Sequence, residues 1–94
     1  MPVDLETIQI IVKGKVQGVF YRQSAKEKAK DLGITGHIRN TQNGEVVIVA
    51  TGPKEKLHSF IRWCREGPPR AIVKDVFIQS LSLQNFETFY IERY

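Results

Sequence analysis

The sequence predicts an α+β fold in which five strands and two helices follow one another in the order βαββαββ. Two observations predict this order. Apolar residues alternate with period two in some segments and recur at helical spacing in others, and an Asn-Gly pair separates two of the expected strands. Ile, Val, Leu and Phe make up 29 of the 94 residues, which is enough for a packed core, so we expect a single domain over residues 1–94.

The first half of the chain reads as strand, glycine loop, helix. In residues 7–13, Ile8, Ile10 and Val12 fall on one face, as in a half-buried strand. A segment with two glycines follows. Residues 22–32 then place apolar side chains at helical spacing, and Gly33 supplies a C-terminal stop.

The second half begins with a hairpin and a helix. Residues 34–40 and 45–51 are β-rich and flank Asn43-Gly44, the dipeptide that best suits a tight turn, so they should pair antiparallel. Pro53 is expected to open a helix that Gly67 closes. Its apolar stripe consists of Leu57, Phe60, Ile61 and Cys64.

Residues 71–80 and 86–93 complete the chain as two further strands with period-two patterns. The resulting order is the split βαβ, or ferredoxin-like, arrangement βαββαβ with a short additional C-terminal strand. Right-handed crossovers should place both helices on one face of a mostly antiparallel sheet. Such a fold hosts enzymes and RNA-binding modules alike, so function must be argued from a site.

Composition limits the classes of ligand and location. The net charge of +4 is concentrated: residues 13–30 hold six Lys or Arg against Glu27 alone. This field favours an anion, which could be nucleic acid, an acidic membrane surface or a small phosphorylated metabolite. One cysteine and two histidines give no basis for a disulfide or a zinc cage. With no apolar run of membrane-spanning length and no basic leader, we expect a cytoplasmic protein.

The segment from Gly14 to Arg22 is the best candidate for the anion site. It joins a strand to a helix N-terminus, where free amides and the helix dipole favour phosphate, and Arg22 adds a planar fork of donors. The spacing of its two glycines excludes both the Walker A pattern and G-x-G-x-x-G. The residues alone leave an ordinary strand-to-helix turn with a solvated arginine as an equal alternative.

The same segment, read as Gly14-Lys-Val-Gln-Gly-Val-Phe-Tyr-Arg22, resembles the signature of the acylphosphatase family, G-x-V-Q-G-V-x-[FY]-R. Residues 36–40 with Asn43-Gly44 are similar to the second motif of that family, and Gly67-Pro68-Pro69 with Ala71 and Val73 to a third. His37 departs from the pattern, because an aromatic residue usually stands there; as the strand neighbour of Ile38 it should face the opposite side of the sheet.

The resemblance implies a metal-free enzyme, without cofactor, that hydrolyses acyl phosphates and acts as a monomer on a small anionic substrate, with inorganic phosphate as product and competitor. It implies Arg22 and Asn40 as catalytic residues, Arg22 holding the phosphoryl group and Asn40 orienting the attacking water. The substrate-binding set, acting through main-chain amides and the Arg22 guanidinium, would be Lys15, Val16, Gln17, Gly18, Val19, Phe20, Tyr21 and Arg22. We expect Phe20 and Tyr21 to wedge this loop against the core.

Two alternatives are weighed against this reading. Cys64 and Arg70 match by count the Cys-x5-Arg loop of cysteine-based phosphatases, but Pro68 and Pro69 remove two of the amides such a loop needs, so a buried, inert cysteine is expected. An RNA-binding module would suit the fold and the basic charge. Residues 45–50 lack the aromatic platform that an RNA-binding sheet requires, so no nucleic-acid partner is expected.

Overall fold

The computed structural model of the protein describes residues 4–93 and contains the predicted order of elements. These are β1 (Leu5–Lys15), α1 (Tyr21–Asp31), β2 (Thr35–Asn40), β3 (Val46–Pro53), α2 (Lys54–Glu66), β4 (Ile72–Leu81) and β5 (Phe89–Ile91). The expected boundaries agree to within a few residues except at the last strand, which is three residues long instead of spanning 86–93.

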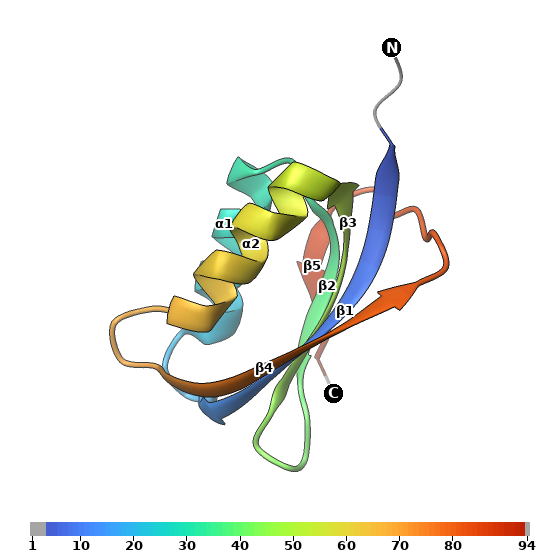
Figure 1. The fold of residues 1–94 in the computed structure, drawn as a ribbon. Coiled ribbons are helices and arrows are strands. Elements are labelled where there is room, and N and C mark those ends of the chain that lie inside the picture. The colour runs from blue at the N-terminus through green and yellow to red at the C-terminus, as the bar shows by residue number, and fades with distance from the viewer. Residues whose placement is uncertain (1–3, 94) are drawn as a thin grey trace.

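The five strands form one sheet in the order β4-β1-β3-β2-β5, so the first strand lies inside the sheet and the last at an edge. Three of the four pairings are antiparallel, including the predicted β2–β3 hairpin, and β5 runs parallel to β2. Figure 1 shows α1 and α2 together on one face of this sheet. The ferredoxin-like α+β arrangement is therefore confirmed.

The core lies between that face and the two helices. Ile10 and Val12 of β1 are fully buried there, as the alternation predicted. Phe60 and Cys64 of α2 have no exposed surface, and fully burying a side chain of the size of Phe60 contributes about 1.5–3 kcal/mol. The predicted apolar stripe is thus the inner face of α2, although Ile61 is only half-buried.

The short last strand has a physical cause. Residues 82–88 must carry the chain from β4 at one edge of the sheet to β5 at the other. On the way, the backbone of Gln84 is held by two buried threonines: its N–H donates to Thr7 Oγ1 (2.9 Å) and its carbonyl accepts from Thr51 Oγ1 (2.7 Å). The chain reaches β2 only at the end of this crossing, where the Gly36 N–H donates to the Thr88 carbonyl (3.0 Å), and β5 consists of Phe89–Ile91.

Within residues 4–93, neither helix has the length and apolar character needed to cross a bilayer.

Candidate active site

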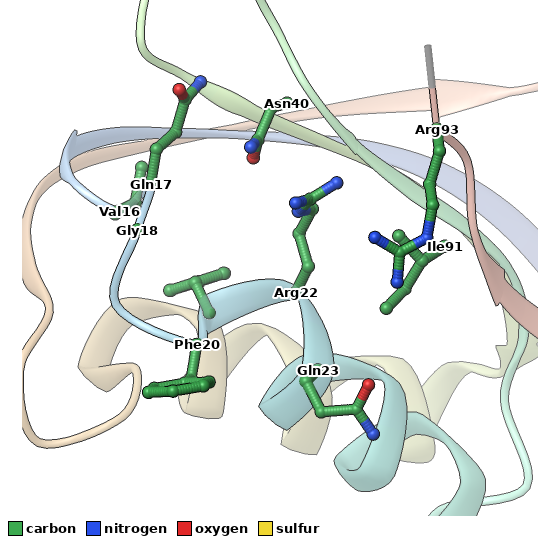
Figure 2. Close-up of a pocket in the computed structure, with 10 residues that line it drawn as sticks. Val16, Gln17, Gly18, Phe20, Arg22, Gln23, Asn40, Ile91 and Arg93 are labelled. Atoms are coloured by element: carbon green, nitrogen blue, oxygen red, sulfur yellow. The ribbon is translucent and has the colours of Figure 1, made fainter.

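A cavity of about 430 Å³ opens where the β1–α1 loop, the end of β2 and the residues around β5 meet (Figure 2). Its lining comes from segments far apart in the sequence. The lining residues are Val16, Gln17, Gly18, Phe20, Tyr21, Arg22, Gln23, Asn40, Ile91 and Arg93. A smaller hollow of about 280 Å³, lined by Arg22, Asn40, Glu92 and Arg93, adjoins it.

The β1–α1 loop leaves several amide groups free to face a ligand. β1 ends at Lys15 and α1 starts at Tyr21, and Gly18 and Phe20 turn the chain between them with positive φ values of 72° and 63°. Among residues 4–93, the first amide of α1 that donates to a backbone carbonyl is that of Ser24, to Phe20 (3.0 Å). The preceding amides therefore lack helical partners and lie at the positive end of the helix dipole.

Phe20 is the unusual residue of this loop. It is the one residue other than glycine in the described part of the chain with positive φ, a conformation that costs an L-residue about 1 to 2 kcal/mol. Its side chain is 73% exposed, so the expectation that it wedges the loop against the core is wrong for Phe20. The left-handed backbone turns this ring outward while Val19 and Tyr21, on either side, are buried.

The expectation is right for Tyr21. Its ring is 1% exposed and its hydroxyl donates to the carbonyl of Cys64 on α2 (2.7 Å). This bond ties the start of α1 to α2, so the end of the loop is attached to the core. Two other residues of the expected binding set, Lys15 and Val19, do not line the cavity: Lys15 is still paired with Ile72 in the sheet, and Val19 is buried.

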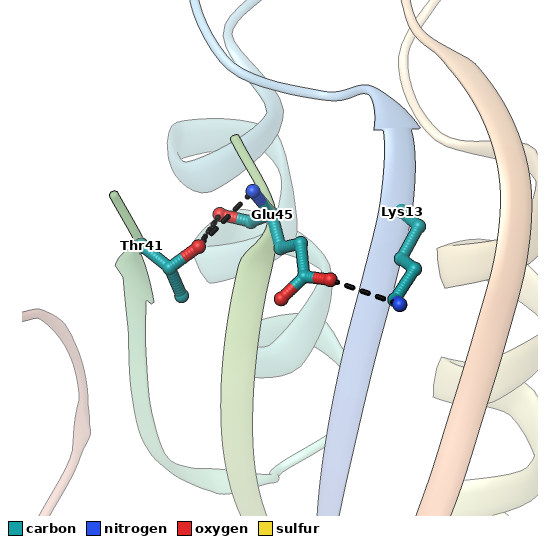
Figure 3. Close-up of polar contacts among 3 residues, drawn as sticks. All are labelled: Lys13, Thr41 and Glu45. Carbon is teal, nitrogen blue, oxygen red and sulfur yellow. Dashed lines mark hydrogen bonds and ion pairs between the residues drawn. The ribbon is translucent and has the colours of Figure 1, made fainter. Parts of the chain in front are cut away.

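Gln17 connects the loop to the β2–β3 hairpin. Its Nε2 donates to the carbonyls of Thr41 (2.9 Å) and Glu45 (2.8 Å). Within the hairpin turn, the Glu45 N–H donates to Thr41 Oγ1 (3.1 Å). The Glu45 carboxylate also pairs with Lys13 (3.2 Å), which attaches the hairpin to β1 (Figure 3). The side chain of Gln17 thus holds the loop in register with the strand end that carries Asn40.

Asn40 is the last residue of β2 and brings an amide group to the cavity. Figure 2 shows its side chain and that of Arg22 extending into the space between the loop and β2. Asn40 Oδ1 is buried and has no hydrogen-bond partner within residues 4–93. A buried polar atom without a partner costs about 1–3 kcal/mol, so a donor such as water would be bound favourably there.

Arg93, Ile91 and Gln23 line the cavity without having been expected there. Arg93 follows β5, and Figure 2 shows it across from the loop, on the far side of Arg22. Neither Arg22 nor Arg93 forms an ion pair with an acidic side chain of residues 4–93, so both guanidinium groups add positive potential to the cavity. Only knowledge that β5 pairs with β2 would have placed Arg93 here.

The residues considered as alternatives lie elsewhere. Cys64 is completely buried, and that burial raises the pKa of its thiol to about 12, so no nucleophilic thiolate forms near neutral pH. His37 faces the side of the sheet opposite to Ile38, as expected, where it contacts the rings of Phe86 and Tyr90 and lies 3.4 Å from a Glu92 carboxylate oxygen. Neither residue lines the cavity.

Two other binding chemistries find little support in the geometry. No three His, Cys, Asp or Glu side chains are grouped to hold a metal ion in the range 4–93. The central strands β1 and β3 contain no aromatic residue, so the platform on which an RNA-binding sheet stacks bases is missing from them.

Comparison with known proteins shows the family of the chain. The acylphosphatase family profile matches residues 8–91. The chain is 48% identical to an acylphosphatase of Marinobacter nauticus, over 85% of this chain and 88% of that one, and 43% identical to one of Vibrio parahaemolyticus, over 88% and 92%. Its fold is similar to that of an acylphosphatase from Coxiella burnetii, with a TM-score of 0.92 and 35% identity over 95% and 94% of the two chains.

Proposed function

The chain belongs to the acylphosphatase family, and on that premise we propose how its cavity hydrolyses the carboxyl–phosphate bond of acyl phosphates. In this proposal the phosphoryl group sits in the β1–α1 loop. Its non-bridging oxygens are bound by the Arg22 guanidinium and by amides of the loop residues that line the cavity, which are Val16, Gln17, Gly18, Phe20 and Tyr21. The observation that carries the proposal is that residues of the β1–α1 loop, Arg22 and Asn40 line one cavity, and that the loop amides donate to no backbone carbonyl among residues 4–93.

Asn40 positions the attacking water. An amide side chain cannot take a proton near neutral pH, so its role is to orient, with Oδ1 accepting one O–H of the water. The buried, unpartnered state of that oxygen supports this role. Transfer of a phosphoryl group depends mainly on alignment and on stabilising charge, both of which this arrangement provides.

The leaving group explains why no general acid is required. A departing carboxylate is stable near neutral pH, so it leaves without being protonated. The proton of the attacking water passes to a phosphoryl oxygen of the substrate itself. Each new bond therefore has a counterpart: water oxygen joins phosphorus, the phosphorus–acyl oxygen bond breaks, and inorganic phosphate and a carboxylate are released.

We propose further that this reaction needs no metal ion and that the protein acts as a cytoplasmic monomer of one domain, without nucleic-acid or membrane partners. The residues that line the cavity include two cationic side chains, Arg22 and Arg93, and no carboxylate. This arrangement suits a small anion that diffuses to the site.

The test is release of inorganic phosphate from benzoyl phosphate by the purified protein in EDTA, with added phosphate as a competitor. We expect turnover that chelator does not reduce and that phosphate inhibits competitively. Turnover that stops in EDTA and returns with added Mg²⁺ would overturn the metal-free mechanism. A protein that released no phosphate under either condition would contradict the activity itself.

A further inference from the structure

Phe20 has a position that phosphate binding does not explain. A phosphoryl group is held by amides and a guanidinium, which need no aromatic ring, yet the loop turns a phenyl ring outward at the rim of the cavity. The ring makes no contact with another aromatic ring among the described residues. A single exposed apolar residue is ordinary. One that lines the cavity and is held in a strained backbone conformation is not.

The geometry of the reaction says what lies beside this ring. In an in-line displacement the leaving group departs on the side of phosphorus opposite to the attacking water. Asn40, which orients that water in the proposed function, and Phe20 lie on different sides of the cavity: Figure 2 shows Asn40 at the end of β2 and Phe20 at the start of α1, with the phenyl ring directed away from Asn40. In the proposed function this direction leads away from Asn40, toward the side of the cavity on which Phe20 lies.

We propose that Phe20 is a specificity-determining residue that packs its ring against the acyl group, so that the enzyme favours acyl phosphates with aromatic or extended apolar acyl groups. This inference rests on the proposed function and goes beyond it by assigning a recognition element to the half of the substrate that is not phosphate. The ring is already exposed and held outward, so no rearrangement is needed to bind the acyl group.

The left-handed backbone allows the ring to be removed without disturbing the loop. Glycine adopts a φ near 63° without strain, so Phe20→Gly keeps the backbone conformation and deletes only the side chain. Phe20→Trp keeps an aromatic surface at the same place. Phe77→Leu, which alters an equally apolar and half-exposed ring on β4 outside the cavity, is the matched control.

The experiment compares kcat/KM for benzoyl phosphate and for acetyl phosphate in the wild type and these three variants. For Phe20→Gly we expect kcat/KM for benzoyl phosphate to fall about three- to tenfold, mostly through KM, as the loss of one aromatic contact implies. For acetyl phosphate, which lacks the aromatic acyl group, kcat/KM should fall less, so that the ratio of the value for benzoyl phosphate to the value for acetyl phosphate decreases. Phe20→Trp and Phe77→Leu should both keep the wild-type ratio of kcat/KM for benzoyl phosphate to kcat/KM for acetyl phosphate.

An unchanged benzoyl phosphate value in Phe20→Gly would overturn the inference, because the ring would then touch no part of the substrate. Equal losses for both substrates would also overturn it and leave Phe20 a purely structural part of the loop. Failure of the proposed function looks different: the wild type itself would cleave neither acyl phosphate.

Discussion

The chain passes from a strand to a helix twice, and the first of the two connections lines the candidate active site. Residues 16–20 intervene between β1 and α1, whereas β3 ends at Pro53 and α2 begins at Lys54 with no residue between them. The residue before α1 is Phe20 in the left-handed conformation, and the residue before α2 is Pro53 in an extended one. The helices that follow are similar in length, so the connections make the difference.

The charges near the two helix starts also differ. The first turn of α1 has no acidic residue and contains Arg22, while the first turn of α2 has Glu55, whose carboxylate complements the dipole of its own helix. A helix N-terminus is therefore not sufficient for anion binding. The loop must be long enough to turn its amides toward one point, and the neighbouring charge must be positive.

Among the substitutions considered, one at Arg22 is expected to lower activity most, because it changes the hydrogen-bond donors beside the β1–α1 loop. Arg22→Lys keeps the charge but loses the planar pair of donors, so kcat/KM for benzoyl phosphate should fall on the order of 10³-fold while inhibition by phosphate weakens. Arg62→Lys, the same exchange on the exposed side of α2, should leave both unchanged. Circular dichroism should show a folded protein in each case, and an Arg22→Lys variant with near-normal kinetics would contradict the role of the guanidinium.

A substitution of Asn40 would test the proposed binding of the attacking water. Asn40→Ala should lower kcat by about 10²–10³-fold with the inhibition constant of phosphate nearly kept, since only contact with the attacking water is lost. Asn43→Ala, in the same hairpin but outside the main cavity, serves as the control and should retain turnover. Near-native turnover in Asn40→Ala would remove its proposed role.

A substitution of Gln17 would test the hydrogen bonds that connect the β1–α1 loop to the β2–β3 hairpin. The β3–α2 connection at Pro53 has no intervening loop of this kind. Gln17→Ala removes two hydrogen bonds to backbone carbonyls and should lower the free energy of unfolding by about 1–3 kcal/mol. It should also lower kcat more than it raises KM, because Arg22 and Asn40 lose their common alignment. Gln42→Ala, at an exposed position of the hairpin turn, is the control. Urea denaturation and steady-state kinetics are measured for both variants. Equal effects from the two substitutions would argue against this connection.

The smallest effect concerns Cys64 on α2. Burial raises the pKa of its thiol from 9.0 to about 12, and burial followed by the neighbouring Cys64 raises the pKa of Tyr21 well above its usual value. Both groups are neutral in the folded state. Their contribution to stability is therefore complete below about pH 9 and is lost as the unfolded chain begins to ionise and pH rises toward 12.

Cys64→Ala should accordingly flatten the alkaline decline of the free energy of unfolding by up to about 1.4 kcal/mol per pH unit above pH 9, and should keep turnover within about twofold. Denaturation curves between pH 8 and 11 measure the first effect, and Tyr21→Phe gives the matched comparison. Loss of turnover in a folded Cys64→Ala protein would contradict the assignment of this thiol as inert.

Much of the fold was predictable because periodicity reports directly which side of an element is buried. Ile10 and Val12 in β1 and Phe60 in α2 are where their spacing places them. The last strand was predicted too long, since nothing local to residues 86–88 shows that Gln84 is held by Thr7 and Thr51. Gln84 lies 33 residues from Thr51 and 77 from Thr7, so no local pattern reveals these contacts.

For the cavity, the sequence alone determined the glycine loop, its positive charge and Arg22 as a candidate, because short-range composition controls all three. Asn40 became a candidate only through the resemblance of residues 36–40 to a family motif. Tertiary structure decided which groups face one another. It turned Phe20 outward, used the Gln17 side chain as a connection to the hairpin, and brought Arg93 to the cavity through the pairing of β5 with β2. The physical reason is that a residue type carries its chemistry with it, whereas its neighbours in space depend on how distant strands pair.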